Sequence, residues 1–384
     1  MAETILILGN GFDIAMGRKT RYTDFIDFEK QLFSNPDEEL LEFLKVKNIR
    51  IEKYRNNLYL RFINENEETL GINWSNIELI ISRLLDAIIY FKNDSDLLFE
   101  SIGLFDTYEF DNVLLDRSNY IAKYYVVKVI AENFGQIEFD NKQKELLIEK
   151  LDELFLDQLD LLIELLEIYL SYLDYIDFKV RGIEARPTAL DAVPNLSHTY
   201  VLNFNYTNTS GHLYGTSEKK THFIHGRIDL DRTFSRINTM VFGIEDKEND
   251  VNSDLIPYQK YYQRVVKETG NKFEGFFKPK DKYSNEGVSK LQLTNIIIYG
   301  HSVDPLDKEI FQKCFELVEA ESEQNIMYKY RFIFTYFDEP AKRSIIKNLA
   351  IILGKEKLIE LTGTQNVVFV KSDDKIGMEK VLLR

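Results

Sequence analysis

The chain has 384 residues, of which 44% are hydrophobic, so it can bury the core of one large domain or of two. Its 63 acidic residues outnumber its 48 basic ones, and the net charge of −15 argues against broad electrostatic binding to nucleic acid or to an anionic membrane. The single cysteine, Cys314, excludes an intramolecular disulfide and a zinc site built from cysteines.

The start of the chain predicts a strand and a glycine turn. Residues 4–8 are a short apolar run that ends at Gly9-Asn10-Gly11, and we expect a helix over most of residues 13–34. Two glycines one residue apart allow a sharp turn and a close approach to the backbone, as in phosphate-binding turns. The apolar run has only four residues and no basic residues before it, so it does not resemble a signal peptide, and no stretch of the chain reaches ~18 apolar residues, so we expect no membrane span. Together with the single cysteine, this predicts a cytoplasmic protein.

The middle of the chain is helical almost throughout. Residues 74–91 carry apolar residues three and four apart, with Ser75 or Asn76 as the N-cap. Residues 146–176 are long, acidic and amphipathic, which favours a core helix with one solvated face over a surface for self-association. We therefore expect a helical insertion over residues 38–185.

Signals of an α/β fold return after the insertion. Apolar strands are predicted within residues 199–207, 220–226, 295–307, 330–338 and 366–370, with helical segments between the last three. The predicted fold is a largely parallel, Rossmann-like sheet with helices on both faces. In this division residues 1–37 and 186–384 form one α/β nucleotide-binding domain, which the insertion interrupts.

Four of the predicted strands end in polar clusters. If these strands are parallel neighbours, the clusters meet at the edge where such sheets bind ligands. The clusters are Gly9-Asn10-Gly11 with Asp13, Asn203 with Asn205, His225-Gly226, and Gly300-His301-Ser302 with Asp304.

The stretches around these clusters resemble, in order, the motifs of the AbiH family of bacteriophage abortive-infection proteins. The resemblance implies a bacterial antiphage effector, and NWSNIE at residues 73–78 also fits the family's helical part. The stretches are ILILGNGFDIAMGRKTRYTDF, VLNFNYTNT, FIHGRI and IIIYGHSVDPLD.

The same motifs are more distantly similar to sirtuin-like NAD-binding domains. That resemblance implies NAD as substrate or ligand, Asn205 orienting the nicotinamide ribose or a water, and His225 as a general base, since histidine ordinarily titrates near neutrality. Two positions depart from the motif: Thr207 stands where an aspartate is expected, and Asp13 where a serine is. The zinc-module cysteines are missing, which makes a peptide deacetylase a poor fit.

The resemblance and the strand-end pattern together define a candidate site. Asn205 and His225 are the catalytic candidates, and no metal is expected. The nucleotide-binding candidates are Gly9, Asn10, Gly11, Phe12, Asp13, Arg18, Asn203, Tyr206, Gly226, Gly300, His301, Ser302 and Asp304.

Structural alternatives accompany these assignments. Asp13 can be an N-cap, the two asparagines can form strand-end turns, and Ser302 and Asp304 can cap a helix over residues 305–319.

At the level of function, the leading hypothesis is NAD+ hydrolysis at the nicotinamide N-glycosidic bond. A nucleotide-binding sensor without catalysis is the alternative, and a nuclease-type toxin is third. The expected partners are a nucleotide, a phage-encoded trigger and a second copy that binds through the helical insertion.

Overall fold

The computed structural model describes residues 3–70, 76–105, 107, 109–113, 118–134, 140–233, 237–244, 254–278 and 292–383. Ser75, one of the two expected N-caps, and the first three residues of the stretch 73–78 lie outside these ranges.

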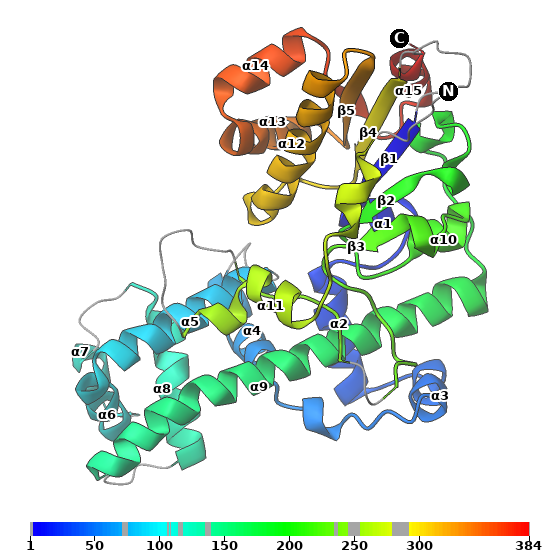
Figure 1. The fold of residues 1–384 in the computed structure, drawn as a ribbon. Coiled ribbons are helices and arrows are strands. Elements are labelled where there is room, and N and C mark those ends of the chain that lie inside the picture. Colours follow the sequence, from blue (N-terminus) through cyan, green and yellow to red (C-terminus); the bar gives the residue numbers. More distant parts are fainter. Residues whose placement is uncertain are drawn as a thin grey trace. The chain divides into compact units, whose positions relative to one another are not determined.

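Six strands form one sheet in which every neighbouring pair is parallel (Figure 1). Their order is β3-β2-β1-β4-β5-β6, so the chain builds outward from β1 on one side and from β4 on the other. This order confirms the expected α/β fold and puts the topological switch point between β1 and β4. The strands are β1 (Glu3–Leu8), β2 (Tyr200–Asn203), β3 (Thr221–Phe223), β4 (Gln292–Tyr299), β5 (Tyr328–Tyr336) and β6 (Val367–Lys371).

Helices cover both faces of the sheet, which explains the continuous apolar run at residues 5–8 of β1. Ile5 and Ile7 pack in one core with α12 (Lys308–Gln324), α13 (Glu339–Leu353) and α14 (Lys355–Gly363). Leu6 and Leu8 pack in the other core, to which α1 (Asn10–Ala15), α10 (Thr209–Tyr214) and α15 (Lys375–Leu382) contribute.

Residues 13–34 are mostly helical, as expected, but a break divides them into two helices. The chain forms α1, which ends at Ala15, and then α2 (Tyr22–Ser34). Gly17 between them has φ +84°, a left-handed conformation that ends a helix, and the Arg18 N–H turns back to the Asp13 carbonyl at 3.0 Å.

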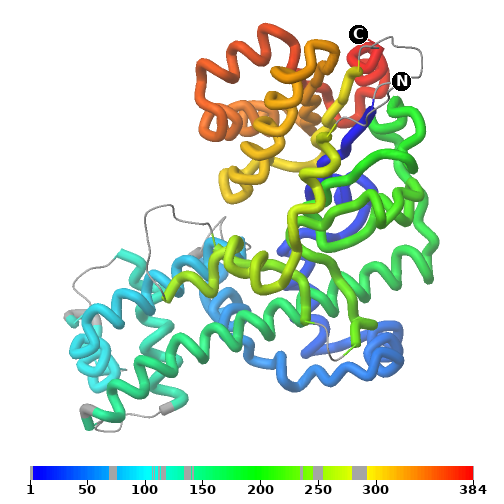
Figure 2. Tube along the Cα trace, viewed as in Figure 1, coloured from blue at the N-terminus to red at the C-terminus, as the bar shows by residue number. Residues whose placement is uncertain are grey.

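Backbone contacts divide the chain into two units. The first comprises Met1–Arg21, Leu170–Met240 and Lys267–Arg384 and contains the sheet. The second comprises Tyr22–Tyr169 and Val241–Val266, so a segment from the C-terminal half returns to the helical part. Figure 2 follows this path by colour along the chain.

The second unit is built from helices, some of which begin at a side-chain cap. The Asn76 side chain accepts the Leu79 N–H at the start of α5, as one of the two expected caps would. Lys260 of α11 lies 3.2 Å from Glu78, which brings α11 beside α5. The helices of this unit are α2, α3 (Glu38–Val46), α4 (Leu58–Leu70), α5 (Ile77–Asn93), α6 (Ser95–Gly103), α7 (Phe110–Val113), α8 (Tyr120–Phe134), most of α9 (Asn141–Asp174) and α11 (Lys260–Val266).

The long helix α9 buries the apolar side chains along one of its faces. Leu151, Phe155, Leu159 and Leu162 are almost fully buried at spacings of four, four and three residues, as a core-facing helix requires. Within the described part of the chain, no helix is both long and apolar enough to cross a bilayer.

Candidate functional site at the carboxyl edge of the sheet

Four neighbouring strands end in one row. Leu8 of β1 pairs with Asn203 of β2 and with Tyr299 of β4, and Asn203 pairs in turn with Phe223 of β3. The strand order therefore brings the four polar clusters to one edge of the sheet. The residues two positions beyond this row are Asn10, Asn205, His225 and His301.

The glycine turn after β1 packs directly on the turn after β4. A Cβ atom on Gly9 or Gly11 would lie 2.7–2.8 Å from the Gly300 carbonyl oxygen, so both glycines are needed for this close approach. The Gly9 N–H donates to the Tyr299 carbonyl at 3.0 Å, and the Gly11 N–H donates to the Gly300 carbonyl at 2.8 Å. A diphosphate cradled by the Gly11 amide would have to displace that carbonyl.

Replacing Gly300 by alanine should therefore destabilise the sheet unit. Gly300 has φ +70°, and its Cβ would stand 2.1 Å from the Phe12 backbone nitrogen. Together the strained backbone and the overlap predict a loss of about 3 kcal/mol in the free energy of unfolding, measured with urea. Gly363→Ala is the control, because a Cβ there meets nothing within 4 Å. Equal stability of the two variants would refute the tight contact.

The two asparagines after β2 divide their roles. The Asn203 side chain accepts the Asn205 N–H at 3.0 Å and donates to the Thr207 carbonyl at 3.0 Å, so it shapes the turn. The Asn205 amide instead reaches across to the β1 turn, where Nδ2 lies 3.1 Å from the Gly9 carbonyl and 3.4 Å from Asp13 Oδ1. Asn205 thus ties the ends of β2 and β1 together.

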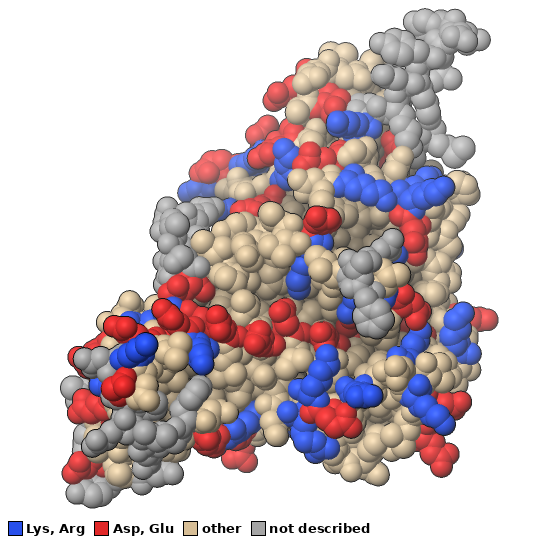
Figure 3. All heavy atoms as spheres, turned by 60° about the horizontal axis from the view of Figure 1, so that its bottom comes forward, with Lys and Arg blue, Asp and Glu red and all other residues tan. Residues whose placement is uncertain are grey.

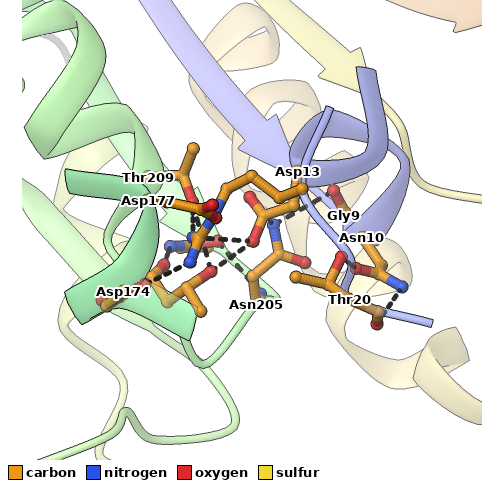
Figure 4. A network of polar contacts seen from close by, with 11 residues as sticks. Gly9, Asn10, Asp13, Thr20, Asp174, Asp177, Asn205 and Thr209 are labelled. Carbon is orange, nitrogen blue, oxygen red and sulfur yellow. Dashed lines mark hydrogen bonds and ion pairs between the residues drawn. The ribbon is translucent and has the colours of Figure 1, made fainter. Parts of the chain in front are cut away.

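Beside Asn205 lies a buried network of polar contacts (Figure 4). Arg18 is at its centre. Its guanidinium donates to Asp174, to Asp177 at 2.9 Å and to the Thr209 hydroxyl, and it lies 3.5 Å from Asp13. Asp174 ends α9, and Asp177 belongs to the π-helical segment Tyr175–Arg181 that follows it. A diphosphate would have to compete with these carboxylates for Arg18, whose side chain is 0% exposed.

The network changes the acidity of its members. Burial raises the pKa of Asp13 to about 6, although Arg18 and the Thr207 hydroxyl, which donates to Asp13, oppose the shift. Burial alone would lower the pKa of Arg18, but Asp174 and Asp13 outweigh it and the pKa rises. The guanidinium is therefore a fixed positive charge, while Asp13 changes charge in mildly acidic solution.

The second group at this edge joins two histidines through one carboxylate. His225 Nε2 lies 3.0 Å from Asp307 Oδ1, and His301 Nε2 lies 3.3 Å from Asp307 Oδ2. The Phe204 ring packs edge-on against both imidazoles, with centroids 5.5 and 4.4 Å away, and Phe311 packs on His301 at 5.0 Å. All three polar side chains are about nine-tenths buried.

Asp307 is the residue that sequence reasoning missed. The sequence DPLD contains two acidic residues three positions apart, and the strand-end pattern placed Asp304, not Asp307, in the candidate site. Asp304 instead accepts the Leu306 N–H and caps the 3₁₀ turn Pro305–Asp307, as its structural alternative proposed. Asp307 precedes α12 but makes no side-chain cap bond to it, so its carboxylate remains directed at the histidines.

The remaining candidates do not all join these groups. Phe12 is fully buried and packs on the Tyr299 ring, and Asn10 is exposed and bonds to Thr20. Ser302 is exposed, and Tyr206 is half-buried.

Gly226 has φ +73°, and its Cβ would overlap the Thr239 carbonyl at 1.8 Å, so the turn beside His225 requires glycine.

Two further features concern the charged side chains at the surface and the possible metal ligands. On the face drawn in Figure 3, Lys and Arg side chains lie in small groups among Asp and Glu rather than in one continuous field. Among the residues that the structure describes, no three His, Cys, Asp or Glu side chains are arranged to hold a metal ion.

A comparison with protein-family models decides the wider assignment. Residues 5–330 match the family model described as bacteriophage abortive infection AbiH. The chain belongs to the AbiH family. This AbiH protein therefore has the bacterial abortive-infection role that the sequence motifs predicted. No curated protein and no solved structure matches the chain, so the chemistry must be argued from the site itself.

Proposed function

We propose that this AbiH protein is an antiphage effector that hydrolyses NAD+ at the nicotinamide N-glycosidic bond. The observation that carries the proposal is the 3.0 Å contact between His225 Nε2 and Asp307 Oδ1 at the carboxyl edge of a Rossmann-ordered sheet. A carboxylate that accepts the Nε2–H of an imidazole leaves the lone pair on Nδ1, which is the arrangement of a general base.

Nicotinamide can leave without being protonated. In hydrolysis a water oxygen bonds to C1′ of the ribose as the bond from C1′ to the nicotinamide nitrogen breaks. The electron pair of that bond neutralises the pyridinium, so no general acid is needed. His225 takes the proton of the attacking water, and the products are nicotinamide, ADP-ribose and one proton.

Asn205 supports the same reaction from the neighbouring strand. Its amide N–H group is held by Gly9 and Asp13, which fixes the side chain at the end of β2. A fixed amide oxygen can orient the ribose hydroxyls or the water. Because the Gly9 and Gly11 amides already bond to the β4 turn, the proposal does not rest on their holding the diphosphate.

The test is the incubation of purified protein with NAD+, with the products identified by mass, in the presence and absence of a phage lysate. We expect nicotinamide and ADP-ribose in equal amounts, and no loss of rate in EDTA, because no step uses a metal. Activity that is lost in EDTA and restored by a divalent cation would instead favour a nuclease-type metal site.

Nucleotide binding without turnover would support the sensor alternative. The distinguishing signal is a melting temperature that rises with NAD+ or ADP-ribose while NAD+ stays intact with the lysate present.

A further inference from the structure

The backbone at Val303 bears on the histidine cluster. Val303 is fully buried and has φ +56°, a left-handed conformation that a β-branched residue adopts only under strong constraint. The Val303 N–H donates to His301 Nδ1 at 2.8 Å. A strained residue at a candidate site therefore holds one nitrogen of one histidine.

That contact fixes the tautomer of His301. A ring nitrogen that accepts an N–H carries no proton, so the ring proton of neutral His301 is on Nε2, 3.3 Å from Asp307 Oδ2. The rings of Phe204 and Phe311 pack on the imidazole and hold its plane.

We propose that His301 is a positioning residue that orients Asp307, which in turn holds His225 with its proton on Nε2 and its lone pair on Nδ1. The Val303 N–H determines which nitrogen of His301 carries the proton, because His301 cannot move its proton to Nδ1 without losing this backbone contact. The inference rests on the proposed function only in taking His225 as the base.

Asp307→Asn tests, without any assay of activity, whether His301 is the fixed histidine and His225 the one that responds to Asp307. The amide replaces one carboxylate oxygen by an NH₂ donor, so one of the two histidines must accept from it and move its proton to Nδ1. We expect His225 to change to the Nδ1–H tautomer while His301 keeps its proton on Nε2. The readout is ¹⁵N NMR of the imidazoles in the full chain, which has only five histidines. A change of His301 instead, or of neither ring, would overturn the proposal.

A matched pair at His301 provides a second test that does not depend on the folding of the first variant. His301→Gln keeps a donor near Nε2, whereas His301→Asn keeps an acceptor for the Val303 N–H but does not reach Asp307. We expect His225 to stay in one tautomer in the Gln variant and to become a mixture in the Asn variant. The same His225 spectrum in both variants would contradict the role of His301. If wild-type protein leaves NAD+ intact, the proposed reaction fails while these spectra still decide the positioning role.

Discussion

Asp307→Asn and His225→Ala should each lower the rate of NAD+ hydrolysis by about 10²–10⁴-fold. His225→Ala removes the proposed base, whereas Asp307→Asn leaves that imidazole in place but should put it in the wrong tautomer. Both substitutions change a polar group at the sheet edge, and neither replaces a residue of the two hydrophobic cores. Initial rates of nicotinamide release, with circular dichroism to check folding, measure the effect.

Two controls match these variants. Asp304→Asn changes the other acid of the same loop and keeps a side chain able to cap the 3₁₀ turn. His198→Ala removes an exposed histidine elsewhere in the sheet unit. Both should hydrolyse NAD+ at nearly the parental rate. Folded His225→Ala protein that is as active as these controls would show that His225 is not the base.

Arg18→Met should destabilise the sheet unit by about 3–5 kcal/mol, because it leaves buried carboxylates without their cation. Asp13 and Asp177 are almost fully buried, and Asp174 is only partly exposed. Such a loss is a large share of the stability of a typical domain, so the protein should unfold at a much lower urea concentration. Arg343→Met, at an exposed position on α13, should change stability by no more than about 0.5 kcal/mol.

The loss of stability in Arg18→Met should depend on pH. The pKa of Asp13 is raised from 3.8 to about 6 in the folded protein, so the folded state binds this proton more tightly and the carboxyl group's contribution to stability falls as the pH rises through this window. Loss of the opposing Arg18 charge raises that pKa further. We therefore expect a smaller deficit near pH 5 than near pH 8, and a deficit independent of pH would exclude the carboxylates as its cause.

The sheet could be predicted from the sequence because its strands are buried on both faces. Continuous apolar runs such as residues 4–8 and the Ile-rich stretch before Gly300 mark such strands without help from long-range contacts. Parallel pairing then puts their carboxyl ends together, so the polar residues at those ends could be expected to share one edge.

The partners of these residues could not be predicted, because they depend on side chains distant in sequence. Arg18 binds acids 156 and 159 residues away, at the end of a helix whose sequence signals only amphipathicity. Which of Asp304 and Asp307 faces the histidines depends on where the helical segment begins. Asp304 caps the first turn, and Asp307, one turn later, is left to contact the histidines.

The two departures from the sirtuin-like motif are in contact with each other. Thr207, which stands where an aspartate was expected, donates its hydroxyl to Asp13, which stands where a serine was expected. A carboxylate and a hydroxyl are thus both present at this point, with their positions in the chain exchanged.

NAD+ content in phage-infected cells tests the central claim most directly, because the abortive-infection role is exercised in infected cells. Cells that express the wild-type chain should lose most of their NAD+ after infection and restrict the phage. Cells that express His225→Ala at an equal level should keep their NAD+ and lose protection, while His198→Ala should behave as wild type. Protection by the wild-type chain with NAD+ undiminished would contradict the account.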